Sequence, residues 1–200
     1  GGAGVSGRPS AEMRQRATYF NFNFFTVWRI DEGTDYPRFR DLGAYAAPAT
    51  VTPDQFGGDG TPETPYIITN ADELNAMRFD LAAHYRLAND IDLSVSVSWD
   101  AGRGWEPVGS STSGQRFTGT LDGAGFAIRN LTVNRPAAAY QGLFGYLDGA
   151  TVRDLRLENA SVRGSDYSGS LTGHALNSLV EHVQASGEVT GGANTGGLAG

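Results

Sequence analysis

The chain has 200 residues and a formal net charge of −7, and all 15 of its basic residues are arginine. This acidic balance excludes the basic surface of a nucleic-acid-binding protein, and no apolar run reaches the roughly 18 residues that a membrane span needs. Cysteine is absent, which excludes disulfide scaffolds, Cys-ligated zinc and thiol nucleophiles. We therefore expect neither nucleic acid nor a membrane span.

Residues 1–42 are expected to form an aromatic N-terminal segment. Ser10 fits the N-cap position of a short helix, and residues 19–30 are rich in Phe and Trp, as in an apolar strand. Residues 31–37 contain the Asp, Gly and Pro residues that favour a turn. The sequence thus predicts a strand that ends in a turn near residue 31.

A linker and then a helix are predicted next. Residues 43–65 hold four prolines and a Gly-Gly-Asp-Gly stretch, which is typical of a linker or long loop. Residues 66–69 restart a strand, and residues 70–81 are amphipathic, with Asn70 or Asp72 as N-cap. A single helix in front of a repetitive β region would cap its open end, because an open end exposes unpaired strand edges.

Residues 66–200 carry two repeating patterns. A glycine signature recurs around Leu143, Leu171 and Leu198, which are 28 and 27 residues apart. An apolar-x-x-apolar-x-apolar pattern also recurs, with offsets of 24 and 28 between its copies. Its triplets are Ile128, Leu131 and Val133; Val152, Leu155 and Leu157; and Val180, Val183 and Ala185, with Ala88, Ile91 and Leu93 as an upstream match.

These patterns predict an all-β fold. Apolar residues two apart point to one face of a strand, and one short coil cannot bury that face alone. Stacked coils bury a continuous core, and crossovers between parallel strands are right-handed in the great majority of cases. We therefore expect a right-handed parallel β-helix (β-solenoid) over residues 66–200 with a short helical cap, in which Leu131, Leu155 and Val183 stack on one another.

Several stretches together resemble GLUG-motif repeat regions. They are Pro65-Tyr66-Ile67-Ile68, Asp72-Glu73-Leu74, residues 84–93, Trp105-Glu106-Pro107-Val108-Gly109, residues 117–125, Ile128-Arg129-Asn130-Leu131 and the glycine signatures. Residues 10–40 look like the closing segment of a preceding array, so residues 1–42 are assigned to it. Ser170 and Thr172 depart from the pattern, which predicts a local distortion, and residues 99–113 form a polar insertion.

The resemblance implies a large secreted or surface-anchored bacterial protein, such as a filamentous adhesin or the non-catalytic part of an IgA-cleaving metallopeptidase. The expected function is a structural or adhesive segment, without catalysis, at an extracellular or cell-surface location. The expected partners are neighbouring repeat segments or further copies arranged head to tail, and a host or matrix glycan or protein. Residues 1–4 and 196–200 share the glycine signature, which suggests one period of a tandem array.

The candidate chemistry is a polar column. The predicted register aligns Asp90, Asn130, Asp154 and His182, each just before an apolar position. Carboxylates and a His in one column could perform acid/base chemistry on a sugar or hold a cation. The simpler interpretation is a strand bend, where Asn and Asp bond their own backbone. The neighbouring column of Arg129, Arg153 and Glu181 fits a solvent-facing charge ladder.

Two weaker ligand hypotheses remain. Asp90, Asp92 and Asp122 could bind calcium, although no intact calcium β-roll repeat occurs, and no other cofactor is expected. Trp99 and Trp105 lie in a polar, Gly-rich stretch and are the preferred glycan-contact candidates, ahead of the tyrosines at 140, 146 and 167. The alternative functions are accordingly a β-helix polysaccharide lyase or hydrolase, and a carbohydrate-binding module.

Overall fold

The computed structural model describes residues 55–200 and the backbone of residues 28–29 and 38–39. The chain divides into two compact units, residues 1–49 and 50–200. In the first, β1 (Trp28–Arg29) pairs antiparallel with β2 (Arg38–Phe39). The predicted helix at Ser10, the rest of the aromatic strand and the turn at residues 31–37 lie outside the described residues.

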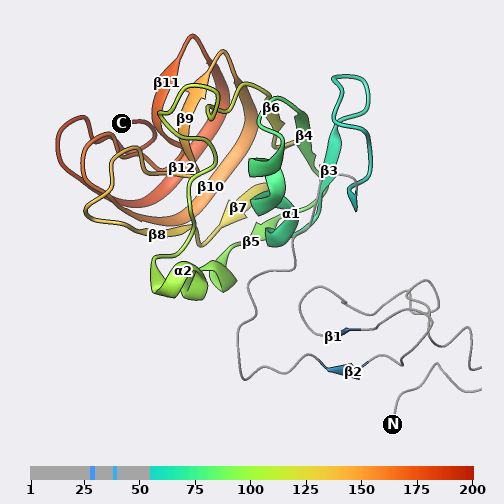
Figure 1. Ribbon diagram of the computed structural model, residues 1–200, viewed down its shortest axis with the longest axis horizontal. Helices are drawn as coiled ribbons and strands as arrows, with labels where there is room; N and C mark the ends of the chain where they lie inside the picture. The colour runs from blue at the N-terminus through green and yellow to red at the C-terminus, as the bar shows by residue number, and fades with distance from the viewer. Residues whose placement is uncertain (1–27, 30–37, 40–54) are drawn as a thin grey trace, which may run out of the picture. The chain divides into compact units, whose positions relative to one another are not determined.

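The second unit is built from parallel strands (Figure 1). Strands β3 (Tyr66–Ile68), β4 (His84–Leu87), β6 (Thr120–Asp122), β10 (Thr151–Arg163) and β12 (Leu179–Thr190) pair in this order, each parallel to the next. The longer β10 also pairs with β7 (Ala127–Arg129) and β8 (Thr132–Asn134), and β7 pairs with β5 (Ile91–Asp92). A second parallel sheet joins β9 (Phe144–Asp148) to β11 (Thr172–Leu176). The predicted all-β class is confirmed.

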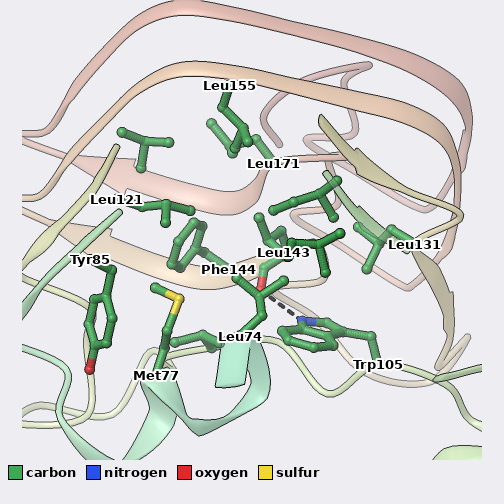
Figure 2. Packing of buried hydrophobic residues seen from close by; sticks show 14 of the residues in the cluster. Leu74, Met77, Tyr85, Trp105, Leu121, Leu131, Leu143, Phe144, Leu155 and Leu171 are labelled. Carbon is green, nitrogen blue, oxygen red and sulfur yellow. Dashed lines mark hydrogen bonds between the residues drawn. The ribbon is translucent and has the colours of Figure 1, made fainter. Parts of the chain in front are cut away.

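Part of the core consists of three apolar columns that cross these strands in register, and Figure 2 shows Tyr85 and Leu121 of the first column among other core residues. The first contains Tyr85, Leu121, Val152 and Val180. The second contains Ile91, Ile128, Leu157 and Ala185. The third contains Val133, Val162 and Val189. The members on β4 to β10 are buried, with exposed fractions of 2% or less. In-register pairing of the strands is therefore what brings these side chains together in the core.

The predicted register of the apolar triplets is half correct. Val152, Leu155 and Leu157 pair with Val180, Val183 and Ala185, as expected. The 24-residue offset is wrong, because Ile128 pairs with Leu157, and Leu121 takes the place opposite Val152. The cause is a tight turn between β6 and β7, in which the Phe126 N–H donates to the Gly123 carbonyl at 2.8 Å. Leu155 therefore stacks on Val183 but not on Leu131.

The glycine signatures do stack with the predicted spacing. The Phe144 N–H donates to the Leu171 carbonyl at 2.8 Å, and the Leu171 N–H donates to the Leu198 carbonyl at 2.9 Å. A Cβ on Gly142 would lie 2.6 Å from the Gly169 carbonyl oxygen, so glycine is needed here for close backbone approach. The predicted distortion at Thr172 is absent, since its pairing with Phe144 is in register.

The predicted helix forms over the first part of its range. It comprises α1 (Ala71–Ala76) and a 3₁₀ turn, η4 (Met77–Phe79). Asn70 is the N-cap, because its Oδ1 accepts the Glu73 N–H at 3.0 Å, and the Glu73 carboxylate in turn accepts the Thr69 N–H. The side chains of Leu74 and Met77 enter the core.

The described part of the predicted linker, residues 55–65, packs on the fold. Gly57 forms an antiparallel bridge with Ile67, whose N–H donates to the Gly57 carbonyl at 2.8 Å. The Phe56 ring is buried and meets Tyr66 edge to face. Residues 55–65 thus form a loop that the bridge and the buried ring hold against β3, and the assignment of residues 43–65 as a linker stays a prediction.

The polar insertion is also packed. The 3₁₀ turn η5 (Ser94–Ser98) precedes it, and it starts with α2 (Trp99–Gly102), in which Asp100 and Ala101 have left-handed φ values of 49° and 55°. After this turn the Trp105 N–H donates to the Thr132 carbonyl at 2.8 Å and the Val108 N–H donates to Leu143 at 3.0 Å. The described residues contain no helix with the length and apolarity needed to cross a membrane.

Candidate functional site

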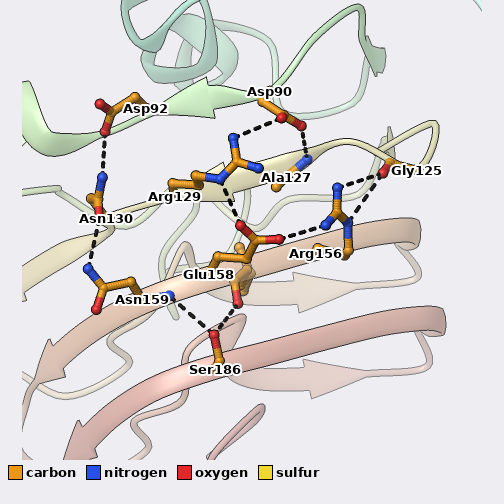
Figure 3. A network of polar contacts seen from close by, with 11 residues as sticks. Asp90, Asp92, Gly125, Ala127, Arg129, Asn130, Arg156, Glu158, Asn159 and Ser186 are labelled. Carbon is orange, nitrogen blue, oxygen red and sulfur yellow. Dashed lines mark hydrogen bonds and ion pairs between the residues drawn. The ribbon is translucent and has the colours of Figure 1, made fainter.

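The outer face of the strand ladder carries a network of charged side chains (Figure 3). Arg129 on β7 lies at its centre, with Nη1 2.8 Å from the Asp90 carboxylate and Nε 2.7 Å from Glu158. Arg156 contacts the other Glu158 oxygen at 2.7 Å. The pKa of Asp90 falls below its ordinary value, because its carboxylate accepts the Ala127 N–H and then the Arg129 guanidinium. Opposite charges thus link three successive layers of the fold.

A second row is built from side-chain amides. The Asn130 amide nitrogen donates to Asp92 at 2.8 Å, and the Asn159 amide nitrogen donates to the Asn130 oxygen at 2.8 Å. Ser186 Oγ accepts the Asn159 backbone N–H at 3.2 Å. The hydrogen bond from Asn130 is the main cause that lowers the pKa of Asp92. This row runs along the stacking direction and ties neighbouring coils together.

The predicted four-residue column divides between different positions. Asp90 bonds the backbone of Ala127, and Asn130 lies in the amide row. Asp154 and His182 do belong together, because their neighbours Arg153 and Glu181 pair in register. Asn130, Asp154 and His182 have left-handed φ values of 60°, 51° and 51°, which Asn, Asp and His adopt more readily than most residues. These three are therefore at bends of the chain.

Asp154 and His182 are the closest approach to an acid/base pair. The His182 Nδ1 lies 3.0 Å from the Asp154 Oδ1, and their side chains are 44% and 77% exposed for Asp154 and His182, respectively. They line an open groove of about 440 Å³ with Arg86, Asp122, Ala124, Gly125, Arg156 and Gln184. Asp122 is already paired with Arg153 at 3.0 Å. An exposed His–Asp contact without a nucleophile beside it supplies little of what hydrolysis requires.

The predicted charge ladder has a different composition from that expected. Its in-register members are Arg86, Asp122, Arg153 and Glu181 on β4, β6, β10 and β12. Arg153 pairs with Asp122, while Arg129, the third residue expected in this column, belongs to the network around Glu158. Charge alternates at every step of this column, which favours the observed register over one that opposes like charges.

The three calcium candidates are separately engaged. Asp90 bonds Arg129, Asp92 bonds Asn130, and Asp122 bonds Arg153. Asp92 also accepts the Ser94 N–H, as Asp122 accepts the Ala124 N–H, in local turns. Within residues 55–200 no three His, Asp or Glu side chains converge as a metal site.

The two tryptophan candidates are buried. Trp105 has an exposed fraction of 0% and Trp99 one of 7%, and their rings stack 6.0 Å apart. The Trp105 Nε1 donates to the Leu143 carbonyl at 2.9 Å (Figure 2), and the Arg78 guanidinium lies 5.9 Å from the Trp105 ring. The expected exposed glycan contact is corrected, because the polar insertion folds back and carries both rings into the core.

A group of partly accessible aromatic rings lies beside β9 and β11 instead. Tyr140 and Tyr167 stack face to face, with centroids 4.8 Å apart and an interplanar angle of 6°. His174 contacts Tyr146 at 4.7 Å and meets Tyr167 edge to face. Tyr140, Tyr167 and His174 are half-buried, whereas Tyr146 is buried. We call these four residues the aromatic cluster.

A cation borders the aromatic cluster. The Arg116 guanidinium lies 4.4 Å from the Tyr146 ring and 2.9 Å from the Asp148 carboxylate. Sequence reasoning placed the tyrosines among the weaker glycan candidates and missed Arg116 and His174. The available signal was the spacing of Tyr140 and Tyr167, which equals one coil and places them on neighbouring coils.

Comparison with known proteins relates the chain to parts of much longer proteins. It is 37% identical over 155 residues to halomucin of Haloquadratum walsbyi, which covers 72% of the chain and 2% of halomucin. It is 38% identical over 124 residues to a Gly-rich membrane protein of Evansella cellulosilytica, covering 59% of the chain and 14% of that protein. An immunoglobulin A1 protease of Streptococcus pneumoniae is 30% identical over 145 residues, or 70% of the chain and 7% of the protease.

The chain therefore spans a small fraction of the relatives it matches. No protein-family profile matches the chain, and no solved structure matches it. The relatives fit the expected repeat region of large surface proteins, in agreement with the broader part of the resemblance. The GLUG assignment itself stays a prediction.

Proposed function

We propose that this chain is a non-catalytic structural segment of a large extracellular or cell-surface protein, in which residues 55–200 form part of a stiff rod of stacked coils. The observation that carries the proposal is the repeated in-register stacking. Phe144, Thr172 and Ala199 are aligned at intervals of 28 and 27 residues, over a core shared by all the coils. Each coil would lengthen such a rod by about 4.8 Å.

The same pairing supports a right-handed parallel β-helix with GLUG-like coils. The strands β3 to β12 pair with one another in parallel, with one isolated antiparallel bridge between Gly104 and Val133, and crossovers between parallel neighbours are right-handed in the great majority of cases. Gly57 and α1 support a closed first end, because Gly57 bridges β3 and the α1 side chain of Leu74 is fully buried. These features suit a segment in which stacking continues away from β3.

The described polar groups favour structure over catalysis. Asp90, Arg129 and Glu158 bond one another across layers, and the His182–Asp154 contact lies in an open groove. Ion pairs of this exposed kind are individually weak because water screens them, so their collective role is to favour one register. The great length of the relatives, and the membrane description of the one from Evansella cellulosilytica, support the proposed location.

Deletion of one whole coil tests the stacking. Removing residues 146–173 joins Gly145 to His174, which takes the place of its in-register partner Tyr146. This variant should keep parallel-strand circular dichroism and a cooperative, somewhat weaker unfolding transition. Removing only residues 160–173 breaks the register and serves as the control. Equal damage by both deletions would contradict the stacked-coil proposal.

A turnover assay tests the non-catalytic part. The chain should release no product from a panel of acidic and neutral polysaccharides, and His182→Ala should behave identically. Product formation that His182→Ala or Asp154→Asn abolishes, with folding retained, would replace the proposal by the lyase or hydrolase alternative.

The aromatic cluster supports glycan binding as a second candidate function. Half-exposed Tyr and His rings beside an arginine and a carboxylate offer apolar and hydrogen-bonding contacts to a sugar. Any binding on a glycan array should then be lost in Tyr167→Ala and retained in Val97→Ala, whose exposed side chain belongs to η5 and not to the cluster. Equal binding by both variants would exclude this site.

A further inference from the structure

Strand β12 presents an unpaired outer edge. Its inner edge pairs with β10 along almost its whole length, from Leu179 to Thr190. No strand of the described residues pairs with its other edge. A twelve-residue strand with free N–H and C=O groups is a ready template for another strand.

The apolar columns of the core are also only partly covered at β12. Val152, Leu155 and Val162 on β10 have exposed fractions of 2% or less, whereas their mates Val180, Val183 and Val189 on β12 are only partly buried. Leu198 is likewise partly buried, although Leu171, the preceding leucine of the signature, is fully buried. The core therefore reaches this surface, and none of residues 55–200 covers it there.

The charged residues of β12 indicate which side chains a strand paired with its free edge should carry. Glu181 ends the alternating column of Arg86, Asp122 and Arg153. Arg153 forms an ion pair with Asp122 at 3.0 Å, and Glu181 has no ion pair within residues 55–200. The next strand in this column would continue the alternation with a basic side chain, because like charges opposite each other are unfavourable.

A second copy fits this edge poorly. Two β12 strands paired antiparallel over their full length would place Glu181 of each copy opposite Glu188 of the other, which gives two like-charge contacts. The other end of the same sheet is partly closed, because Gly57 bridges Ile67 and donates no long strand. The free edge therefore favours a parallel coil with complementary charge over another molecule of this chain.

We propose that β12 and the Leu198 coil form a docking surface for one further parallel coil of about 28 residues, with apolar residues over Val180, Val183 and Val189 and a basic residue opposite Glu181. The inference rests on the proposed structural function and adds the register and charge of the neighbour. Glu181 acts as a register determinant in this surface.

The full chain can be supplied with such a coil. Residues 146–173 are the coil that pairs with residues 174–200 in the structure. A second copy of residues 146–173 appended after Gly200 therefore places its Val152 and Leu155 equivalents over Val180 and Val183, and its Arg153 equivalent opposite Glu181. The matched control is the same extension with that arginine changed to glutamate.

Hydrogen exchange of β12 amides is the readout, with β10 amides as an internal reference. The arginine extension should slow exchange in β12 at least tenfold relative to the unextended chain, and the glutamate extension should give roughly two- to fivefold less protection. In a Glu181→Arg background the order of the two extensions should reverse, and this difference should shrink at high salt.

Three results would overturn the inference. The first is an unchanged exchange rate of β12 amides in the arginine extension, and the second is the same ranking of the two extensions with Glu181 and with Glu181→Arg. The third is protection of β12 in an unextended chain that sediments as a dimer, because a second copy would then be the occupant. If β10 stays protected in all variants, the stacked-coil proposal survives such a failure; if β10 is also unprotected, the proposed function fails with it.

Discussion

Replacing Trp105 should weaken folding, because the ring is a core residue. Trp105 has no exposed surface, contacts the Trp99 ring and lies beneath the Arg78 guanidinium. Truncation of such a ring to alanine removes its packing and leaves a cavity, at a cost of about 3–5 kcal/mol. Small domains have only about 5–15 kcal/mol of stability in total, so Trp105→Ala should be strongly destabilised.

The hydrogen bond of the indole contributes a smaller share. The Leu143 carbonyl accepts both the Trp105 Nε1–H and the Val108 N–H, so it keeps one donor when the indole is lost. Trp105→Phe, which retains most of the packing, should therefore cost only about 1–3 kcal/mol.

Urea titration followed by circular dichroism measures these differences. Phe79→Ala is the control, because this ring is 55% exposed and its loss should change the free energy of unfolding by about 0.5 kcal/mol or less. A Trp105→Ala protein as stable as Phe79→Ala would refute the burial of the indole. It would also return Trp105 to the group of candidate glycan contacts.

Three further predictions concern the coils and the polar network. Leu171→Ala should lower the free energy of unfolding by about 2–5 kcal/mol, while Leu198→Ala should cost less than half as much because Leu198 is only partly buried; equal losses in urea would contradict an uncovered end. Gly142→Ala should cost about 1–3 kcal/mol, since the added Cβ would lie 2.6 Å from the Gly169 carbonyl, and an unchanged melting temperature would argue against this close approach. The Ala127 N–H and Arg129 lower the pKa of Asp90 in the folded state, so the stabilisation by the Asp90 carboxylate is present above the unfolded-state pKa of about 3.9 and is lost as the pH falls below it. Asp90→Asn should therefore reduce the loss of unfolding free energy at acidic pH. An identical loss in both proteins would refute the role of this carboxylate.

Local sequence patterns determined the helix and the glycine coils. Asn70 followed by Glu73 specifies a helix start through side-chain bonds that span three residues. The signatures around Leu143, Leu171 and Leu198 recur at one coil length because each repeats the same close contact between backbones. Such patterns can be predicted because the residues that form them are either neighbours or identical copies.

Tertiary structure decided which strands meet. The apolar template fits Ile128 opposite Val152 or Leu157 equally well by composition, and only the folded turn at Gly123 selects Leu157. This shift moves Arg129 from Arg153 to Glu158 and places Asn130 beside Asn159. This five-residue shift in pairing therefore reassigns the polar contacts between β7 and β10.

Burial of the insertion likewise depended on long-range contacts. Trp99 and Trp105 have polar and glycine neighbours in sequence, yet Thr132 and Leu143, far along the chain, supply the hydrogen-bond partners that hold Trp105 in the core. The aromatic cluster forms in the same way, because Tyr140 and Tyr167 meet only once two coils stack. Whether an aromatic side chain faces water or the core is set by the neighbouring coil, which the local sequence does not contain.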